Sequence, residues 1–528
     1  MKRRTIYLLL VLAYSLGLYA QSLQEVAHAF TDKECYLTGE RLHVSVAVTD
    51  NACHSLDVSK VAYVEISDAR HVCAQGMIAL EEGRGWADIP LPSTMHSGKY
   101  LLSVYTRAMC NDAPSSAYHK IISVINVLHV THQDEIAFVD DEGSASAFKD
   151  EVLSEAKVVS VGDMVGIAAP DDALLSTVSL IRTDLMIPDY GAIVPELNMS
   201  EEKGTDVNET FLPEVEGHIV KAEAVDGTSV SLSRLVMVGK RTMIFDGQEQ
   251  PDGSWMYYTN ALHGKLPAMI CGYDSVGAVV PMRIVSPYAR ILPRNLPRLM
   301  VHCTEEQLRA RSMDAQREQV LSDGMAASDT LAHRLDFFSS DPYNFYDLDE
   351  WTRLNSVREI LAEFVRGVKR QKMKGVGKLY TFDSETNSYS QWPALVLLDG
   401  VPVYDIDTFL DYDARLLKYV QIYAERYTFG ETVCQGIISF ISQKGRLSNY
   451  QLDEGQHLVS YDFPQHRPAF VVPEDNTTGT LYWNPSFSVN QSIPAPKAPG
   501  DYQLIRQYMD AEGNTHRLVE HWVVRPNE

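Results

Sequence analysis

The residues best suited to metal chemistry in this chain are His516, Glu520 and His521, close to its C-terminal end. Imidazole nitrogens and carboxylates are common ligands of catalytic zinc, and zinc motifs hold them at a fixed spacing on a helix. Three residues separate His516 from Glu520, which is one more than an inverted zinc motif has. The segment also has the pattern of a strand, on which adjacent side chains point to opposite faces. We therefore expect ordinary surface or core histidines and no metal site.

A second set of candidate ligands is the acidic run of Asp341, Asp347, Asp349 and Glu350. Calcium prefers carboxylate oxygens, but a calcium loop also needs a glycine and a regular ligand spacing that this run lacks. We expect a solvated acidic loop at these residues.

The sequence has neither a glycine-rich phosphate loop nor the Gly-x-Ser-x-Gly turn of serine hydrolases. The sequence does not exclude a catalytic triad assembled from distant loops, although no spacing in it indicates one. We therefore predict that the protein is not an enzyme. We assign no catalytic, cofactor-binding or metal-ligating residue, and we expect no cofactor.

The chain has seven cysteines, so at least one is unpaired or paired between molecules. No two of them form a Cys-x-x-Cys pair, which argues against a zinc or thioredoxin-like site. We expect small buried hydrophobic residues, and a disulfide within the first domain stays open. Four fall in the first domain and three are scattered: Cys35, Cys53, Cys73, Cys110, Cys271, Cys303 and Cys434.

The composition is that of a globular protein, with 45% hydrophobic and 22% charged residues among 528. This length favours several domains over a single core. The formal net charge of −24 disfavours binding to a nucleic-acid backbone and, equally, to anionic lipid. We expect a soluble acidic surface and no nucleic-acid partner.

Residues 1–20 have the pattern of a signal peptide. Lys2, Arg3 and Arg4 form a basic start, a short apolar run follows over 6–18, and Ala20 offers a small residue for cleavage. The apolar run is short for a spanning helix, and no later stretch approaches that length. We expect an exported protein with no transmembrane segment in the mature chain.

Residues 21–127 are predicted to form an immunoglobulin-like β-sandwich. Apolar and polar residues alternate over 42–48, and a second strand is predicted over 61–66. The first domain resembles the macroglobulin-type domain of α2-macroglobulins and of exported Bacteroidota proteins. That domain is a structural module, so the resemblance implies no catalytic residue. The matching residues are Asp32, Lys33, Tyr36, Leu37, Thr38, Gly39, Glu40, Leu91, Pro92, Ser97, Gly98, Lys99, Tyr100, Tyr105, Thr106 and Arg107.

Residues 246–250 resemble the thioester site of the α2-macroglobulins. The stretch runs from Asp246 through Gly247 to Gln250 and contains no cysteine. Because a thioester needs a thiol, we expect no covalent trapping of a protease.

The middle of the chain is predicted to hold two more sandwiches and a connector. Residues 128–213 are predicted to form a second β-sandwich. Residues 214–290 resemble the carboxypeptidase-regulatory type of small β-sandwich, with a turn at Asp252 and Gly253. Residues 291–345 are predicted to be a helical connector with a helix over 304–321.

Residues 346–446 are predicted to form a small α/β domain. A helix begins after Ser356, and the turn Asp399-Gly400 joins two short strands. A short helix over 406–410 and strands over 416–423 and 436–441 complete the pattern. The order of these segments resembles the plug domain of TonB-dependent outer-membrane receptors. The 83 residues after Gly445 are too few for a receptor barrel, so we expect no self-contained transporter.

The expected fold is therefore mainly β: tandem immunoglobulin-like, macroglobulin-type sandwiches plus a small α/β plug-like domain. Residues 447–528 are predicted to be a β-rich, macroglobulin-like segment. These resemblances imply a non-enzymatic protein of the cell envelope, periplasmic or peripherally attached to the outer membrane. It would bind or scaffold a protein partner in the outer membrane or periplasm. The alternative is a macroglobulin-like protease-binding protein without a thioester.

Overall fold

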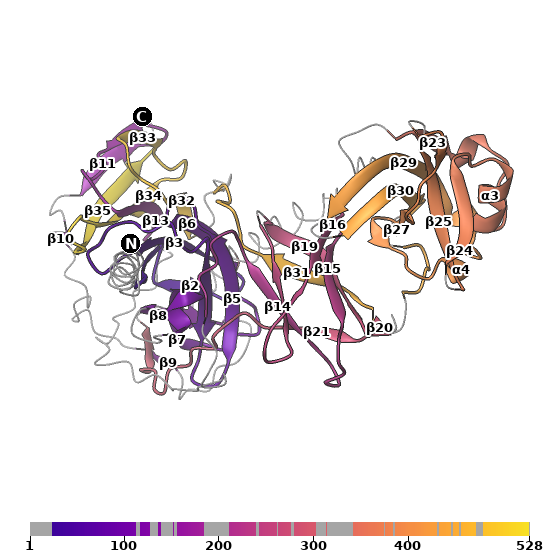
Figure 1. Cartoon of the computed structure of the whole chain (residues 1–528). Coiled ribbons are helices and arrows are strands. Elements are labelled where there is room, and N and C mark those ends of the chain that lie inside the picture. Colours follow the sequence, from indigo (N-terminus) through magenta and orange to yellow (C-terminus); the bar gives the residue numbers. More distant parts are fainter. Residues whose placement is uncertain are drawn as a thin grey trace, which may run out of the picture. The chain divides into compact units, whose positions relative to one another are not determined.

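The computed structural model describes most of the chain as strands arranged in two compact units (Figure 1). Unit 1 comprises Met1–Gly217, Tyr288–Ala326 and Pro464–Glu528, and unit 2 comprises His218–Pro287 and Ala327–Phe463. The mainly-β expectation is confirmed. Within the described residues, no helix is both long and apolar enough to cross a membrane. Those residues are 24–111, 117–126, 136–138, 151–152, 156–183, 211–238, 242–260, 262–275, 279–301, 313, 342–373, 375–383, 386–429, 432–444, 447–452, 456–470 and 479–526.

Residues 24–126 form the first sandwich, which belongs to unit 1. The predicted strands over 42–48 and 61–66 are confirmed as β3 and β4. One sheet has the order β1-β3-β6, with β1 Val26–Thr31, β3 Arg41–Thr49 and β6 Arg84–Pro90. The other has the order β2-β8-β7-β4-β5, with β2 Cys35–Leu37, β8 Tyr118–Ile125, β7 Gly98–Thr106, β4 Val61–Ser67 and β5 Val72–Ala79.

The second sandwich of unit 1 is built from two distant segments, and we call it the composite sandwich (residues 151–152 and 156–183 with 479–526). Its central strand β13 (Leu175–Arg182) pairs with β34 (Gly500–Met509) on one side and β32 (Thr480–Asn484) on the other. Trp522 and Tyr502 are fully buried in its core. The remaining strands are β10 Glu151–Val152, β11 Lys157–Ser160, β12 Met164–Ile167, β33 Gln491–Pro494 and β35 Thr515–Arg525.

The structure therefore corrects the predicted boundaries of two domains. We expected residues 128–213 and 447–528 to be separate, but β13 lies between two strands that follow it by about three hundred residues. The physical reason is that periodicity along a chain reports which face of a strand is buried but not which strand pairs with it.

Unit 2 contains a third sandwich, residues 218–285 together with 458–463. Its strand β31 (Leu458–Phe463) comes from the predicted C-terminal segment and pairs with β19 (Gly264–Tyr273) along six residues, which is a second departure from the predicted boundaries. The other strands are β14 Ile219–Ala224, β15 Leu232–Met237, β16 Met243–Asp246, β17 Gln248–Glu249, β18 Trp255–Tyr258, β20 Val279–Val280 and β21 Met282–Val285.

The rest of unit 2 is an α/β layer, residues 342–452. Its main sheet has the order β23-β29-β30-β27-β28, and one apolar cluster joins this layer to Val236, Met269 and Cys271 of the third sandwich. The elements are β23 Asn344–Asp347, η2 Leu348–Glu350, α3 Val357–Glu363, β24 Val368–Met373, β25 Val376–Asp383, β26 Ser388–Tyr389, β27 Leu395–Leu398, β28 Val401–Pro402, α4 Ile406–Phe409, η3 Ala414–Leu416, β29 Leu417–Phe429 and β30 Thr432–Ser442.

The predicted elements of the α/β layer are confirmed, including the helix caps. The Ser356 hydroxyl accepts from the Glu359 N–H at the start of α3, and Asp405 caps α4 in the same way. Helix α3 ends at Glu363. The predicted helix over 304–321 lies outside the described residues apart from Met313.

Outside these layers, three short elements belong to unit 1. They are η1 Ala108–Asn111 and the parallel pair β9 Ile136–Phe138 and β22 Leu299–Val301.

Candidate functional site

The histidines singled out for zinc chemistry lie on β35, as the strand pattern predicts. His516 Nε2 lies 2.9 Å from Asp510 Oδ2, and its ring stacks on Tyr508. Glu520 accepts a 2.6 Å hydrogen bond from Arg506. Since adjacent residues of a strand face opposite ways, Glu520 and His521 point to different sides of the sheet. His516 and Glu520 therefore have separate partners, and the three residues do not converge on one point.

The thioester-like stretch is a turn between β16 and β17 of the third sandwich. Asp246 accepts a 3.0 Å hydrogen bond from Arg234 Nε, and the Gly247 N–H donates to the Ser233 carbonyl at 2.8 Å. A side chain at Gly247 would come within 2.9 Å of the rings of Trp255 and Tyr257, so glycine is required by packing. The stretch has a clear structural explanation.

The acidic run and the cysteines also have local explanations. Asp347 caps η2 through the Asp349 N–H, and Asp349 pairs with Arg353, while Asp341 lies outside the described residues. Cys53, Cys73, Cys110 and Cys434 are free thiols, and Cys303 lies outside the described residues.

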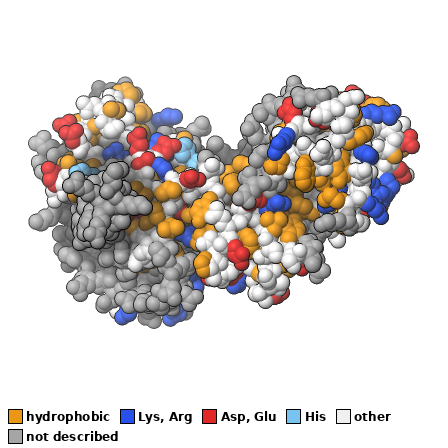
Figure 2. Space-filling model, in the orientation of Figure 1, with side chains coloured by type: hydrophobic (Ala, Val, Ile, Leu, Met, Phe, Trp, Pro, Cys, Tyr) orange, Lys and Arg blue, Asp and Glu red, His pale blue; other side chains and the backbone are white. Residues whose placement is uncertain are grey.

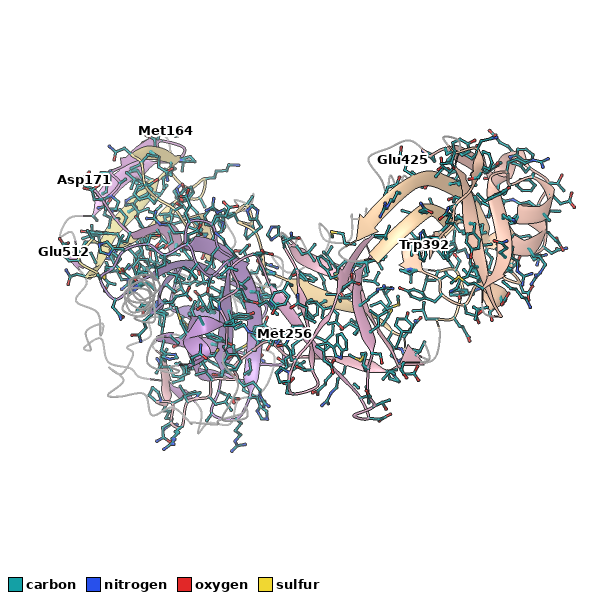
Figure 3. The ribbon with its side chains drawn as sticks, viewed as in Figure 1. Met164, Asp171, Met256, Trp392, Glu425 and Glu512 are labelled. Atoms are coloured by element: carbon teal, nitrogen blue, oxygen red, sulfur yellow. The ribbon has the colours of Figure 1, made fainter. Side chains whose placement is uncertain are left out.

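A preformed cavity of about 390 Å³ lies within unit 1, between the first and the composite sandwich. Its volume is in the range of binding pockets, about 300–1,000 Å³. The first sandwich contributes Ser45, Glu81, Glu82, Arg84 and Trp86. The composite sandwich contributes Asp172, Leu174, Leu175, Phe487 and their neighbours, and Arg467 completes the wall. Figure 3 labels Asp171, which precedes the lining residue Asp172 at the outer end of the composite sandwich.

Trp86 and Arg467 form the best-fixed wall of this cavity. The Trp86 indole N–H donates to the Pro468 carbonyl at 3.1 Å, and the Arg467 guanidinium lies 5.0 Å from the Trp86 ring centre. Arg467 Nη1 and His466 Nε2 lie 2.9 and 2.6 Å from the two carboxylate oxygens of Glu81. A cation over an aromatic face and a paired carboxylate keep both side chains in place.

The chain that carries Arg467 is itself tied to the first sandwich. The Gln465 N–H donates to the Met77 carbonyl at 2.8 Å, and the Ala79 N–H donates to the Gln465 carbonyl at 2.8 Å. The Gln465 side chain bonds to both backbone groups of Asp88. The cavity wall is therefore held by backbone pairing, so the cavity exists before any ligand arrives.

The chemistry of the cavity suits binding. Leu175 and Phe487 are buried and give it an apolar floor, while Glu82 and Asp172 are exposed at its rim. An apolar floor with a few fixed charged groups can hold one or two side chains of an extended protein segment. The sequence did not reveal this site, because its residues come from five separate stretches of the chain.

Near the cavity, His43 forms a buried ion pair with Asp88. Nδ1 of His43 lies 2.5 Å from Asp88 Oδ1, and its ring packs against Phe470 and Trp483. Burial lowers the pKa of His43, but its hydrogen bond to the Asp88 carboxylate and the charges of Asp32 and Asp88 outweigh it, so the pKa lies above 6.5.

Stability of unit 1 should therefore depend on pH through His43. Its pKa is raised in the folded state, so the folded protein holds this proton longer than the unfolded chain. The free energy of unfolding should fall as pH rises from 6.5 through the raised pKa of His43. His43→Phe keeps an aromatic ring beside Phe470 and should lose this fall, measured by denaturant unfolding across that pH range. His28, whose pKa is lowered, is common to both proteins, so identical pH profiles would contradict the assignment.

No protein-family model matches the chain, and no curated protein matches it. Among solved structures, trypsin-activated α2-macroglobulin of Escherichia coli is 10% identical, and the match covers 96% of this chain and 24% of that one, with a TM-score of 0.17. The elastase-activated form of the same protein is 9% identical over 95% of this chain and 44% of that one, with a TM-score of 0.23. Latent PorU of Porphyromonas gingivalis is 9% identical over 96% of this chain and 34% of that one, with a TM-score of 0.15.

The chain thus spans about a quarter of the first of these proteins. Identities and TM-scores this low transfer neither an activity nor a binding site.

Proposed function

We propose that this chain is a non-enzymatic protein of the bacterial cell envelope that binds a protein partner through the cavity of unit 1. One observation carries the proposal, namely the preformed cavity with its fixed Trp86–Arg467 wall. Tryptophan and arginine are the residue types that most often dominate binding energy at protein interfaces. Because the wall is already ordered, binding would cost little conformational entropy.

The partner would insert an extended segment or a loop. The buried floor of Leu175 and Phe487 favours an apolar side chain, and the exposed carboxylates of Glu82 and Asp172 favour a basic residue next to it. The sandwiches around the cavity would serve as rigid spacers.

The location of the protein in the envelope belongs to this proposal. It is supported by the signal-peptide pattern of residues 1–20 and by the resemblance of 346–446 to a receptor plug. The protein would be exported, would work in the periplasm or at the outer membrane without forming a pore of its own, and would come from the Bacteroidota.

Trp86→Ala should reduce recovery of the partner at least tenfold, because it removes the cavity wall. The measurement is affinity capture of tagged protein from detergent-solubilised envelopes, with quantification of co-purified proteins. Trp351→Ala is the matched control, because it removes another partly exposed tryptophan (43% exposed) that lies in unit 2. Recovery should be unchanged in this control.

A second variant separates binding from folding. Glu82 is exposed at the rim, so Glu82→Lys should leave the melting temperature nearly unchanged and still weaken capture. Equal recovery by the two cavity variants and the control would contradict the proposal, as would purification of the wild type without any partner. Capture of a protease through this cavity would favour the alternative of a protease-binding protein.

A further inference from the structure

The hairpin of β24 and β25 projects a basic surface from the α/β layer. The two strands pair antiparallel from Val368↔Thr381 to Met373↔Val376. Gly375, between the paired ends, has φ +88°, which glycine adopts without strain, and a side chain at this position would meet no atom within 4 Å. The tip of the hairpin is therefore free to approach another surface.

The charge of this hairpin is opposite to that of the whole protein. The stretch 366–378 contains no Asp or Glu, although the chain has a net charge of −24. Residues 369–373 are all exposed, and Figure 2 shows Lys and Arg side chains gathered on the side of the α/β layer where Figure 1 places β24. The basic residues of the stretch are Arg366, Lys369, Arg370, Lys372, Lys374 and Lys378.

Part of this positive charge has no ion pair among the described residues. Asp407 of α4 ties the base of the hairpin down, because it pairs with Arg370 at 2.5 Å and accepts the Gly377 N–H at 2.9 Å. Within the described residues, Lys372 and Lys378 have no carboxylate at ion-pair distance. By contrast, three arginines elsewhere in the layer pair with nearby aspartates: Arg353 with Asp349, Arg358 with Asp411, and Arg415 with Asp413.

Two apolar side chains stand at the tip of the hairpin. Met373 and Val376 are cross-strand partners next to the turn, and they are 44% and 47% exposed. Behind them, the Tyr380 hydroxyl lies 3.9 Å from the Met373 sulfur, which supports the methionine from below. An exposed apolar pair at a tip, with lysines set further back along the strands, is the arrangement that enters the boundary between lipid headgroups and acyl chains.

We propose that the β24–β25 hairpin is a peripheral attachment site for a membrane surface that carries anionic lipid. Met373 and Val376 enter the headgroup boundary, while Lys369, Lys372 and Lys378 meet lipid phosphates. Anionic lipid surfaces attract such basic clusters over about a Debye length, roughly 8–10 Å at physiological salt. The acidic remainder of the chain is repelled, so only an orientation with the hairpin toward the membrane is favourable. A lipid surface offers both phosphates for the lysines and acyl chains for the apolar pair, so it is the occupant we propose.

The test is co-sedimentation of the full chain with vesicles of phosphatidylcholine, with or without added phosphatidylglycerol. We expect at least tenfold stronger binding to the vesicles with phosphatidylglycerol, and loss of this binding at high salt. Lys372→Glu with Lys378→Glu should reduce binding at least tenfold. Arg70→Glu with Lys157→Glu, an equal charge change at exposed or partly exposed sites of unit 1, should not reduce it.

The apolar tip distinguishes a membrane from other polyanions. Met373→Ser with Val376→Ser should weaken vesicle binding several-fold without any change of charge. Equal binding to both kinds of vesicle, or equal binding by the hairpin and control variants, would overturn the proposal. Unchanged vesicle binding by the serine variant would overturn it too, and would assign the lysines to a soluble polyanion. Trp86→Ala should bind vesicles like the wild type, so this test and the partner-capture test fail independently.

Discussion

Asp32→Ala is expected to lower the free energy of unfolding of unit 1 by about 3–5 kcal/mol. The Asp32 carboxylate is fully buried and joins three separate stretches of chain. It accepts hydrogen bonds from the Tyr36 hydroxyl at 2.8 Å, the His43 N–H at 3.2 Å and the Thr480 hydroxyl at 2.6 Å. Alanine would remove this acceptor from all three buried donors, of which the Tyr36 hydroxyl keeps the Lys33 carbonyl at 2.8 Å. The loss of an acceptor inside the protein costs more than the same loss at the surface.

The stability lost in Asp32→Ala should come mainly from the contact between the first sandwich and the composite sandwich. Thr480 belongs to β32, and Ser179 of β13 donates to the Asp32 carbonyl at 2.9 Å, so both link the composite sandwich to the first. Thr480→Val, which removes one of these links, should cost only about 1–2 kcal/mol.

The reporter for unit 1 is the Cys35 thiol, which is 6% exposed, and its alkylation in denaturant can be followed by peptide mass spectrometry. Asp57→Ala is the control, because that carboxylate is 48% exposed and pairs with Lys60 at the surface, a contact that contributes at most about 1 kcal/mol. A cost for Asp32→Ala as small as that of Asp57→Ala would show that the two sandwiches are not joined in this way.

Asp399→Ala should destabilise the α/β layer by about 3 kcal/mol or more. Asp399 Oδ1 accepts from the Ser442 N–H at 2.7 Å, and Oδ2 accepts from the Ser442 hydroxyl at 2.7 Å and the Leu447 N–H at 2.8 Å. The residue also has φ +49°, which aspartate and asparagine tolerate better than alanine. The substitution therefore removes three hydrogen bonds and adds backbone strain.

Asp399→Asn is the matched comparison for this residue. Its amide keeps an acceptor oxygen and the preference for a left-handed turn, so it should cost clearly less than alanine. Alkylation of the buried Cys434 thiol reports on this layer. Equal costs for the two variants would mean that the side-chain oxygens do not hold the turn to β30.

Much of the α/β layer could be predicted from the sequence because its signals are local. The turn at Asp399 and Gly400 depends on two adjacent residues that adopt positive φ, and the caps at Ser356 and Asp405 act within one helical turn. The residues that determine such a turn or helix cap lie within a few positions of one another, so the sequence alone predicts it.

The composite sandwich and the cavity could not be predicted, because they depend on pairing between distant stretches. Nothing near Val178 in the sequence indicates that it pairs with Asn484 and Arg506. Trp86 and Arg467 likewise meet across 381 positions of the chain. The basic hairpin was present in the sequence, but the net charge averages its lysines with acidic residues elsewhere. The expectation of no contact with anionic lipid rests on the net charge, whereas the hairpin proposal rests on how the charge is distributed.

The most direct test of partner binding through the cavity is hydrogen exchange of the full chain, alone and with the protein recovered by affinity capture. Bound partner should slow exchange of the backbone amides at residues 81–86, 172–176 and 485–488, which line the cavity. The Trp86→Ala variant should show no such protection at the same partner concentration. Protection of these segments by the partner would support binding through the cavity. Protection confined to unit 2, with the cavity segments unchanged, would contradict it.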